Sequence, residues 1–533
     1  MAPRTFNPTF SAHMLSRRQL LHGFAAVAAS SVLSGCGAAL VRPISSSNGA
    51  PPVTPPATPP ATPPVMPPTS PPVTPPAQPA APISQPLPSG VLTAASLTVA
   101  STTVGSFDPG FFGLAYEKQS LLTPLFTDSN LLGLFRRLGP GVLRIGGASV
   151  DQGVWTSDGP GHTPGHVAPS DVDALASFLR ATGWSCIYGI NLGGSATGAT
   201  IPTLAAAEVA YVAQQLGSAL LGIELGNECE TYGASFYPSN WSVEIFEALW
   251  QQYRSAIVAV TPNAPICGPA SGSNLDTWTL PFGEYVTSSQ INLLTQQYSR
   301  GPASTASVDD LITPDAALST ELLMLHYGAQ SIDVPFRIDG LSSYDDGGAP
   351  GVSNSYASSL WVIDAIFQTA VAGGSGINLQ CGGQQPGTAI ADNNGSVVGP
   401  QPVFYGALLA AMAGTGTLLT TQLSAGALNV TAYALETSDG ISLVLVNKDA
   451  TANLDLSIVL PQAMSSAALQ QMTQLSAGAA ASSLTALSGI TIQGATVATD
   501  GAFQPGAPYS LTLNRTQLSC YVPALSAVLI QLT

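Results

Sequence analysis

From about Phe107 onward, short apolar runs alternate with longer segments of helical periodicity, and this alternation limits the fold of the 533-residue chain more than any other feature. We expect helices over 171–182, with Ser170 as the N-cap, and over 203–220. Eight strands separated by helices over about 300 residues predict an α/β fold, the (β/α)8 TIM barrel with insertions. The predicted strands are FFGLAY (111–116), VLRI (142–145), CIYGINL (186–192), LLGIEL (220–225), PICGP (265–269, the weakest), INLLTQQY (291–298), VPFRID (334–339) and GINLQ (376–380).

A doubly wound sheet is the competing α/β architecture, but its usual signatures are missing from the sequence. No predicted strand is followed by GxGxxG, and no GxxxxGK[ST] occurs. Because Lys118 and Lys448 are the only lysines in the chain, a phosphate-binding loop has no candidate lysine. The barrel is therefore the predicted architecture.

After Tyr405 the pattern changes to a period of two residues, which is typical of antiparallel strands. Residues 428–448 alternate on both sides of Asp439-Gly440, a strong hairpin signal, and further alternating runs end at 526–532. Residues 91–104 have the same pattern, so we expect an N-terminal strand to join an accompanying C-terminal antiparallel β-sandwich. A separate carbohydrate-binding module is less favoured, because no cluster of exposed aromatic residues is evident.

The N-terminal segment resembles an export signal. Residues 16–21 (SRRQLL) match a twin-arginine signal, and the apolar run over 23–32 is too short to span a bilayer. The following Leu33-Ser34-Gly35-Cys36 resembles a bacterial lipobox, which implies cleavage before Cys36 and lipidation of its thiol. A plain signal peptide is the alternative. We expect an exported protein of the bacterial cell envelope, attached to the membrane only through its lipidated N-terminus.

Between Pro51 and Pro88 the strings PPVT, PPAT and PPVM repeat with almost no charged or aromatic residues. Such a segment cannot bury a core and should extend as polyproline II, reaching on the order of 100 Å at ~3.1 Å per residue. We interpret it as a spacer, since a proline-motif ligand would have flanking basic residues. The predicted domains are a lipoprotein signal (1–36), a proline-rich linker (37–89), N-terminal strands that join the sandwich (90–106), the barrel (107–410) and the β-sandwich (411–533).

Charge, cysteines and histidines narrow the possible partners. The net charge of −16 would repel a phosphate backbone, so no nucleic-acid partner is expected. Apart from Cys36, five cysteines remain without a CxxC pair, and their connectivity cannot be inferred from spacing. The histidines include no HExxH, and we interpret His162 and His166 as ordinary loop residues. No metal and no cofactor is predicted.

The segment LGIELGNECE carries the main chemical signal. A barrel strand that ends at Asn227-Glu228 places a carboxyl group at the C-terminal mouth of the barrel, where barrel enzymes hold their catalytic groups. General acid catalysis of glycoside cleavage needs such a carboxyl, kept protonated by its surroundings. The Asn227 amide beside it can hold a sugar hydroxyl. Glu228 is therefore the predicted general acid/base.

Several segments together resemble glycoside hydrolase family 79, the β-glucuronidase and heparanase-like family, over about residues 92–533. The resemblance implies a retaining exo-glycosidase with an oligo- or polysaccharide substrate, in which Glu228 is the acid/base and Asn227 its partner. Glu117 matches the glutamate of the first barrel strand. The matching segments are FFGLAYEKQSL (111–121), FRRLGPGVLRIGGASVD (135–151), IELGNECE (223–230), LTQQYSRGP (294–302), GGAPGVSNSYASSLWVIDAIFQ (347–368) and PVFYGALL (402–409).

The sequence departs from the family at the second catalytic carboxylate. Family members carry a nucleophilic glutamate in a pattern like R-x-x-E-x-x-S-F, and here residues 337–344 read RIDGLSSY, so Gly340 occupies that position. The family's histidines near the sixth and eighth strands appear as Gln297 and Gln380, and an asparagine after RIGG appears as Ala148. The remaining residues implied to bind substrate are Tyr298 and Tyr344.

Two interpretations follow from this departure. In the first, the protein is a β-glucuronidase-like glycosidase for β-linked uronic-acid-type glycosides, and another carboxylate replaces the nucleophile. Asp339 is adjacent but should point away from the barrel axis unless a bulge turns it. Asp345 and Asp346 lie on the next loop and either reach inward or form a solvated turn. Space left at Gly340 would admit a water and an inverting mechanism, which needs ~6.5 to 9.5 Å between carboxyls.

In the second interpretation, hydrolysis is lost and the barrel mouth binds glycans, because removal of a nucleophile lowers the rate by several orders of magnitude. Arg337 and Arg300 are possible partners for a substrate carboxylate, although a structural role is the more common one for such residues.

Overall fold

The computed structural model describes residues 83–272, 274–474 and 482–533. The predicted signal, Cys36 and most of the proline-rich linker lie outside the described residues. Among the helices of the described ranges, none combines the length and the apolar character needed to cross a bilayer.

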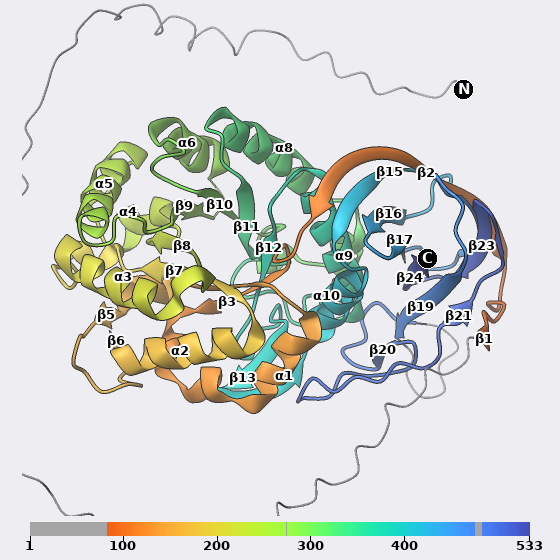
Figure 1. Ribbon diagram of the computed structural model, residues 1–533, viewed down its shortest axis with the longest axis horizontal. Helices are drawn as coiled ribbons and strands as arrows, with labels where there is room; N and C mark the ends of the chain where they lie inside the picture. The colour runs from red at the N-terminus through yellow and green to blue at the C-terminus, as the bar shows by residue number, and fades with distance from the viewer. Residues whose placement is uncertain (1–82, 273, 475–481) are drawn as a thin grey trace, which may run out of the picture. The chain divides into compact units, whose positions relative to one another are not determined.

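Eight parallel strands close into a barrel, which confirms the predicted fold class (Figure 1). Each predicted apolar run forms one strand, PICGP included. Around the ring each strand lies beside its neighbours in sequence, and the last strand pairs with the first. The strands are β3 (Gly113–Glu117), β4 (Val142–Gly146), β7 (Ser185–Ile190), β8 (Leu220–Leu225), β9 (Ile266–Ser271), β10 (Leu293–Tyr298), β11 (Phe336–Leu341) and β12 (Ile377–Gln380).

The helices follow the barrel strands in the chain. Helix α2 begins at Pro169 and not after Ser170, because the Asp171 carboxylate accepts the backbone N–H of Ala168 at 2.9 Å and so caps the helix two residues earlier. Helix α3 ends before Gly217 (φ 55°). The helices are α1 (Ser129–Leu138), α2 (Pro169–Thr182), α3 (Pro202–Leu216), α4 (Tyr232–Ser235), α5 (Val243–Val260), α6 (Leu280–Tyr285), α7 (Val308–Ile312), α8 (Ala316–Ser331), α9 (Tyr356–Val371) and α10 (Pro402–Met412).

Two short strand pairs lie in loops at the C-terminal side of the barrel strands. They are β5 (Val154–Trp155) with β6 (His166–Val167), and β13 (Ile390–Asn393) with β14 (Ser396–Pro400).

The accompanying β domain is one continuous sheet of mainly antiparallel strands, and one face packs into its own core. The long strand β2 pairs with both β15 and β18 before the chain enters the barrel at β3. The predicted hairpin forms, with Ser438 and Asp439 as the turn between β16 and β17 and Gly440 as the first residue of β17, paired with Thr437. The strands are β1 (Ile83–Ser84), β2 (Leu92–Phe107), β15 (Gly416–Ser424), β16 (Val430–Thr437), β17 (Gly440–Asn447), β18 (Asn453–Val459), β19 (Ala467–Gln474), β20 (Ile490–Ile492), β21 (Tyr509–Ser510), β22 (Leu513–Asn514), β23 (Gln517–Val522) and β24 (Ser526–Leu532).

Asp364 on α9 ties the barrel to this sheet. Its carboxylate forms a buried ion pair with Lys448 and accepts hydrogen bonds from Thr431 and from Tyr433, the latter at 2.9 Å. We expect Asp364→Ala to lower the free energy of unfolding by about 3 to 5 kcal/mol, because it leaves the Lys448 ammonium buried without its counter-charge. Urea denaturation measures this effect. The exposed Asp455→Ala variant is the control, and equal stability of the two variants would contradict the assignment.

Arg337 and Arg300 are both structural. The buried Arg337 guanidinium donates to the carbonyls of Gly110 and Phe111 at 3.1 Å and to Asn378 Oδ1 at 2.6 Å, near the N-terminal ends of the strands. Arg300 pairs with Asp310 at 3.4 Å and with Asp315 at 3.3 Å. Arg337 therefore lies at the end of the barrel opposite Glu228, and the Arg300 guanidinium is already paired with two carboxylates, so neither is available to a substrate carboxylate.

Candidate functional site

The turn after β8 fixes the position of Glu228. Gly226 has φ 82°, and a Cβ there would lie 2.4 Å from Cys229 Sγ and 2.5 Å from Tyr232 Oη, so a larger residue does not fit. Glu228 itself is left-handed, with φ 45° and ψ 50°, which costs of order 1 to 3 kcal/mol in a residue other than glycine. Its backbone N–H donates to the Ala270 carbonyl at 3.0 Å. A strained, well-held turn thus presents the carboxyl at the C-terminal mouth of the barrel.

The surroundings of the Glu228 carboxyl favour its protonated form. The side chain is half-buried, and its carboxyl has no hydrogen bond or ion pair among the described residues. Burial raises the pKa of Glu228 above its ordinary value; the Arg144 charge opposes this, and the negative charges of Glu117, Asp345 and Asp346 add to it. A carboxyl with a raised pKa at the rim of a barrel has the property that a general acid needs.

Asn227 lies beside Glu228 and is held by two donors. Its Oδ1 accepts from Arg144 Nη2 at 3.0 Å and from Gln297 Nε2 at 3.1 Å. Its Nδ2 has no partner within the described part of the chain. The amide is therefore fixed in orientation, with its donor group available to a ligand.

Gln297 occupies the space that a side chain at position 340 would need. A Cβ on Gly340 would lie 2.7 Å from Gln297 Oε1 and 2.8 Å from Cγ, while Gln297 Nε2 donates to the Ala270 carbonyl at 3.0 Å. The expectation of open space for a water at Gly340 is therefore wrong. The Gln297 amide thus fills the space beside Gly340, the position at which the sequence resemblance places a nucleophile.

Asp339 points into the barrel, the orientation that the sequence analysis allowed only if a bulge turned the side chain. In the pairing with β10, Gln296 lies opposite Ile338 and Gln297 opposite Gly340, so Asp339 is the extra residue of a bulge. Its carboxylate lies 3.1 Å from Arg144 Nε. The side chain is fully buried, and its pKa is well above the ordinary value because of this burial.

Glu224 completes this buried charge cluster under the mouth. Its Oε2 accepts from Arg144 at 2.7 and 2.8 Å, and its Oε1 accepts from Thr295 at 2.9 Å. One guanidinium between two buried carboxyls is stable when one carboxyl is neutral, which agrees with the raised pKa of Asp339. The cluster holds Arg144, and through it Asn227, and does not itself reach the surface.

Asp345 and Asp346 lie on the exposed loop after β11. Asp345 accepts a hydrogen bond from Ser299, and its backbone N–H donates to the Gly301 carbonyl at 2.9 Å. Asp346 has φ 55°. Both side chains are exposed, and their negative charges raise the pKa of Glu228.

Glu117 ends β3, at the C-terminal side of the barrel, and its negative charge raises the pKa of Glu228. Its Oε2 accepts from the Ser149 N–H at 2.9 Å and from Ser149 Oγ at 2.5 Å. In the ring, β3 and β11 are each three strands from β8, so Glu117 is as far around the barrel from Glu228 as Gly340 is. Gln380 lies half-buried at the end of β12, on the inward side shared with Asn378.

Tyr298 and Tyr344, expected to bind substrate, point away from the mouth. The Tyr298 hydroxyl donates to Asp315 Oδ2 at 2.8 Å and the Tyr344 hydroxyl to Asp310 Oδ2 at 2.7 Å. Both rings are buried against the segment around α7 and α8. For Tyr298 the reason is the strand period: Gln297 faces inward, so its neighbour faces outward.

Glu230 is a site residue that the sequence analysis did not identify. Its Oε1 accepts from Ser271 Oγ at 2.9 Å and from the Gly272 N–H at 2.5 Å, whereas its buried Oε2 has no partner among the residues that the structure describes. Burial raises the pKa of Glu230 to about 7. A Cβ on Gly272 would lie 3.1 Å from Glu228 Oε1 and 3.2 Å from Glu230 Oε1, so the two carboxyls adjoin. The second glutamate in NECE was the available signal.

Asp151 supports the loops below these acids. It accepts the N–H groups of Leu192 and Gly193 at 2.9 and 2.8 Å and the Tyr232 hydroxyl at 2.5 Å. Burial raises its pKa. The described residues contain no group of three His, Cys, Asp or Glu side chains arranged to hold a metal, and the five cysteines within them are unpaired and buried.

No protein-family model matches the chain, and no curated protein matches it. Solved structures of glycoside hydrolases match its fold. A 4-O-α-L-rhamnosyl-β-D-glucuronidase from Fusarium oxysporum aligns with a TM-score of 0.68 and 17% identity over 82% of this chain and 100% of that one. A GH51 arabinofuranosidase from Xanthomonas axonopodis pv. citri aligns with a TM-score of 0.59 and 16% identity over 83% of this chain and 100% of that one. CelM2, a bifunctional glucanase-xylanase from a metagenome library, aligns with a TM-score of 0.57 and 13% identity over 82% of this chain and 99% of that one. At these identities the likeness establishes the fold alone.

Proposed function

We propose that this protein is a glycoside hydrolase of the β-glucuronidase-like type, exported to the cell envelope, with Glu228 as its general acid/base. The observation that carries the proposal is the half-buried Glu228 carboxyl, which has a raised pKa and no internal partner at the mouth of a (β/α)8 barrel. General acid catalysis by such a group contributes roughly 10²- to 10⁴-fold to a rate. The Fusarium glucuronidase, which shares the fold, supports this substrate class.

We assign the second carboxylate to Glu117. It stands at the end of a barrel strand, which positions a catalytic group more firmly than a loop does, and Ser149 orients it through two hydrogen bonds. Among the facing acids its charge acts most strongly on Glu228, ahead of Asp345 and Asp346. Asp339 is excluded because it is buried against Arg144.

A uronate substrate would be held by neutral donors in this mouth. Arg144, the guanidinium nearest to Glu228, is committed to Glu224 and Asp339. We assign this role to the Asn227 Nδ2, which has no partner among the described residues, and to the half-buried Gln380 amide at the end of β12. Hydrolysis of phenyl β-D-glucuronide and phenyl β-D-glucoside, with the product anomer followed by proton NMR, tests the substrate class and separates retention from inversion.

The second candidate function is glycan binding without hydrolysis. Gln297 favours it, because a neutral amide stands where the resemblance places the nucleophile. Absence of turnover on both phenyl glycosides, together with glycan binding that Glu228→Gln preserves, would support this alternative against the hydrolase.

A carboxylate restored at position 340 should increase activity only if Gln297 is shortened. We expect Gly340→Glu/Gln297→Ala to raise kcat roughly 10-fold, because a nucleophile enters cleared space, and Gly340→Glu alone to give no gain, because Gln297 lies 2.7 Å from the new Cβ. Gln297→Ala alone is the matched control. A gain in the single Gly340→Glu variant equal to that in the double variant would contradict this account of the site.

A further inference from the structure

Glu230 is a half-buried acid beside Glu228 to which the proposed reaction assigns no role. It lies in the short turn Cys229–Thr231 that follows β8, and its Oε1 accepts from Ser271 Oγ at 2.9 Å and from the Gly272 N–H at 2.5 Å. Its Oε2 is buried and has no hydrogen-bond partner in the part of the chain that the structure describes. Donors therefore compensate the charge of an ionised Glu230 at only one of its two oxygens.

The Glu228 and Glu230 carboxyls converge on Gly272, the residue after β9. A Cβ at this position would lie 3.1 Å from Glu228 Oε1 and 3.2 Å from Glu230 Oε1, so both oxygens approach one point, where glycine places no side chain between them. Two carboxyls held this close and away from bulk water repel each other when both are ionised. The ionisation of one therefore raises the pKa of the other, and the pair loses its protons in two coupled steps.

The surroundings of Glu230 let it ionise near neutral pH. Burial, and to a smaller extent the charge of Glu228, raises the pKa of Glu230 to about 7, and the hydrogen bonds that its Oε1 accepts oppose this. Strand β9, against which Glu230 rests, has neither an acidic nor a basic side chain. Cys229 of the same turn and Tyr232 of α4 stay neutral, because burial holds their pKa values well above the ordinary ones. Glu228 is thus the charged neighbour of Glu230.

Glu228 meets charges from three further elements. Burial raises its pKa most, and Arg144 on β4 lowers it. Glu117 at the end of β3 raises it, as do Asp345 and Asp346 on the loop after β11. The two aspartates are exposed, so salt screens their charges, whereas it screens a buried charge much less. Salt therefore separates the effect of a buried neighbour from that of the loop.

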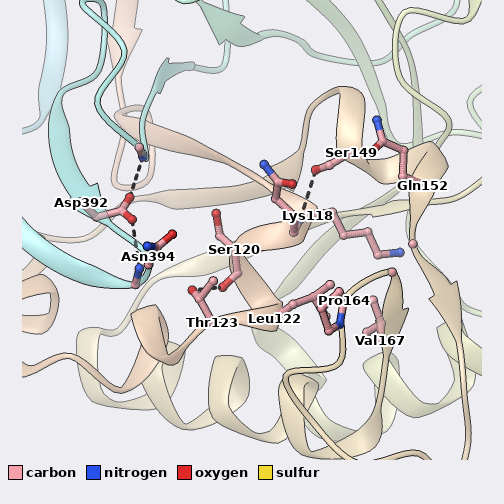
Figure 2. Close-up of a pocket in the computed structure, with 15 residues that line it drawn as sticks. Lys118, Ser120, Leu122, Thr123, Ser149, Gln152, Pro164, Val167, Asp392 and Asn394 are labelled. Atoms are coloured by element: carbon pink, nitrogen blue, oxygen red, sulfur yellow. Dashed lines mark hydrogen bonds between the residues drawn. The ribbon is translucent and has the colours of Figure 1, made fainter.

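Glu117 can be altered separately from Glu230. Its Oε2 accepts from Ser149 Oγ at 2.5 Å, and the same hydroxyl oxygen accepts the Gln119 N–H at 3.1 Å (Figure 2). Both partners belong to the loops after β3 and β4, whereas Glu230 rests on β9. A change at Glu230 therefore leaves the hydrogen bonds of Glu117 in place.

We propose that Glu230 is a positioning residue for the Glu228 proton: once ionised, its carboxylate keeps a proton on Glu228 and so extends activity toward alkaline pH. The two carboxyls alone carry this coupling, whereas its effect on the rate rests on the proposed function. Below its pKa of about 7, Glu230 is neutral and does not act on Glu228; above that pH its charge opposes the loss of the Glu228 proton.

Carbon-13 NMR of protein labelled at the glutamate side-chain carboxyls tests the coupling without a substrate. We expect the Glu230 signal to titrate at a pH of about 7 in wild type and roughly 0.5 pH unit or more lower in Glu228→Gln, which removes the negative neighbour. The exposed Glu436→Gln on β16 is the control and should leave the Glu230 midpoint unchanged. An equal midpoint in wild type and Glu228→Gln would overturn the coupling.

The pH dependence of kcat/KM on phenyl β-glycosides tests the effect on the rate. Glu230→Gln keeps an oxygen that accepts from Ser271 and Gly272, and each profile is scaled to its own maximum, so a purely structural loss does not move it. At about pH 9 we expect the scaled kcat/KM of Glu230→Gln to be roughly 3-fold or more below that of wild type, in about 1 M NaCl as well as in low salt. Equal scaled profiles, or a difference that disappears at high salt, would overturn the role of Glu230.

The two measurements separate this proposal from the proposed function. No turnover by wild type, with the shift of the Glu230 midpoint intact, would reject the hydrolase and the effect on the rate but retain the coupled carboxyls.

Discussion

Replacement of Glu228 by glutamine should lower kcat on phenyl β-glycosides at least 1,000-fold while leaving the fold intact. Glutamine keeps the size and the left-handed backbone of this position, and the Glu228 carboxyl has no partner to lose within the described ranges of the chain. The loss is therefore the missing proton donor, for which roughly 10²- to 10⁴-fold is usual. Steady-state kinetics measure the effect.

The control for this variant is Glu436→Gln, an exposed glutamate on β16 far from any barrel strand end in sequence. We expect it to retain the wild-type rate, and both variants to unfold within about 0.5 kcal/mol of wild type. A Glu228→Gln protein with more than a tenth of the wild-type kcat would rule out the assignment of the general acid.

Glu117→Gln is expected to lower kcat at least 100-fold. The variant keeps a side chain that Ser149 can orient, but it removes the negative charge that faces the anomeric carbon from β3. If Glu117 only binds substrate, KM rises and kcat is retained. The separate kcat and KM values from full saturation curves therefore distinguish the two roles.

Asp345→Asn/Asp346→Asn is the matched comparison for Glu117. Both charges raise the pKa of Glu228, so their removal lowers that pKa. Activity needs protonated Glu228 and falls as pH rises through its pKa; the basic limb of the pH–rate profile should hence move to lower pH. We expect less than a 3-fold change in kcat at the optimum. A 100-fold loss here, with Glu117→Gln active, would transfer the role to the loop.

The strands of the barrel were predictable because each one is a short apolar run between helical segments. Buried parallel strands leave that signal in any sequence, and even PICGP formed β9. The placement of Glu228 followed from the same logic, since the residues after a barrel strand lie at the C-terminal mouth. The glycine before Asn227-Glu228 agrees with this placement, because Gly226 and the left-handed Glu228 form the turn that ends the strand.

The orientations within the site were not predictable from strand period alone. One extra residue in β11 turns Asp339 into the barrel, and a bulge of this kind has no local sequence signature in RIDGL. The burial of Tyr298 and Tyr344 depends on Asp315 and Asp310, which other elements supply. Long-range packing therefore decided these positions.

The positions of Gln297 and Glu230 in the site could not be predicted either, because they depend on contacts between different strands. Gln297 could be recognised as a substitution for histidine, but only the fold shows that it fills the space at Gly340. Glu230 adjoins Glu228 because both lie against Gly272 from the next strand. Neither contact joins residues that are neighbours in the chain.

The dependence of rate on the leaving group tests the central claim most directly. A general acid matters most when the departing oxygen is basic. Glu228→Gln should therefore lose at least 1,000-fold in kcat/KM, which reports the step that expels the leaving group, on phenyl β-glycosides, and less than 10-fold in kcat/KM on the 2,4-dinitrophenyl analogues, whose leaving group needs no proton. Equal losses on both substrates, or equal rates with wild type on both, would contradict the role of Glu228 as proton donor.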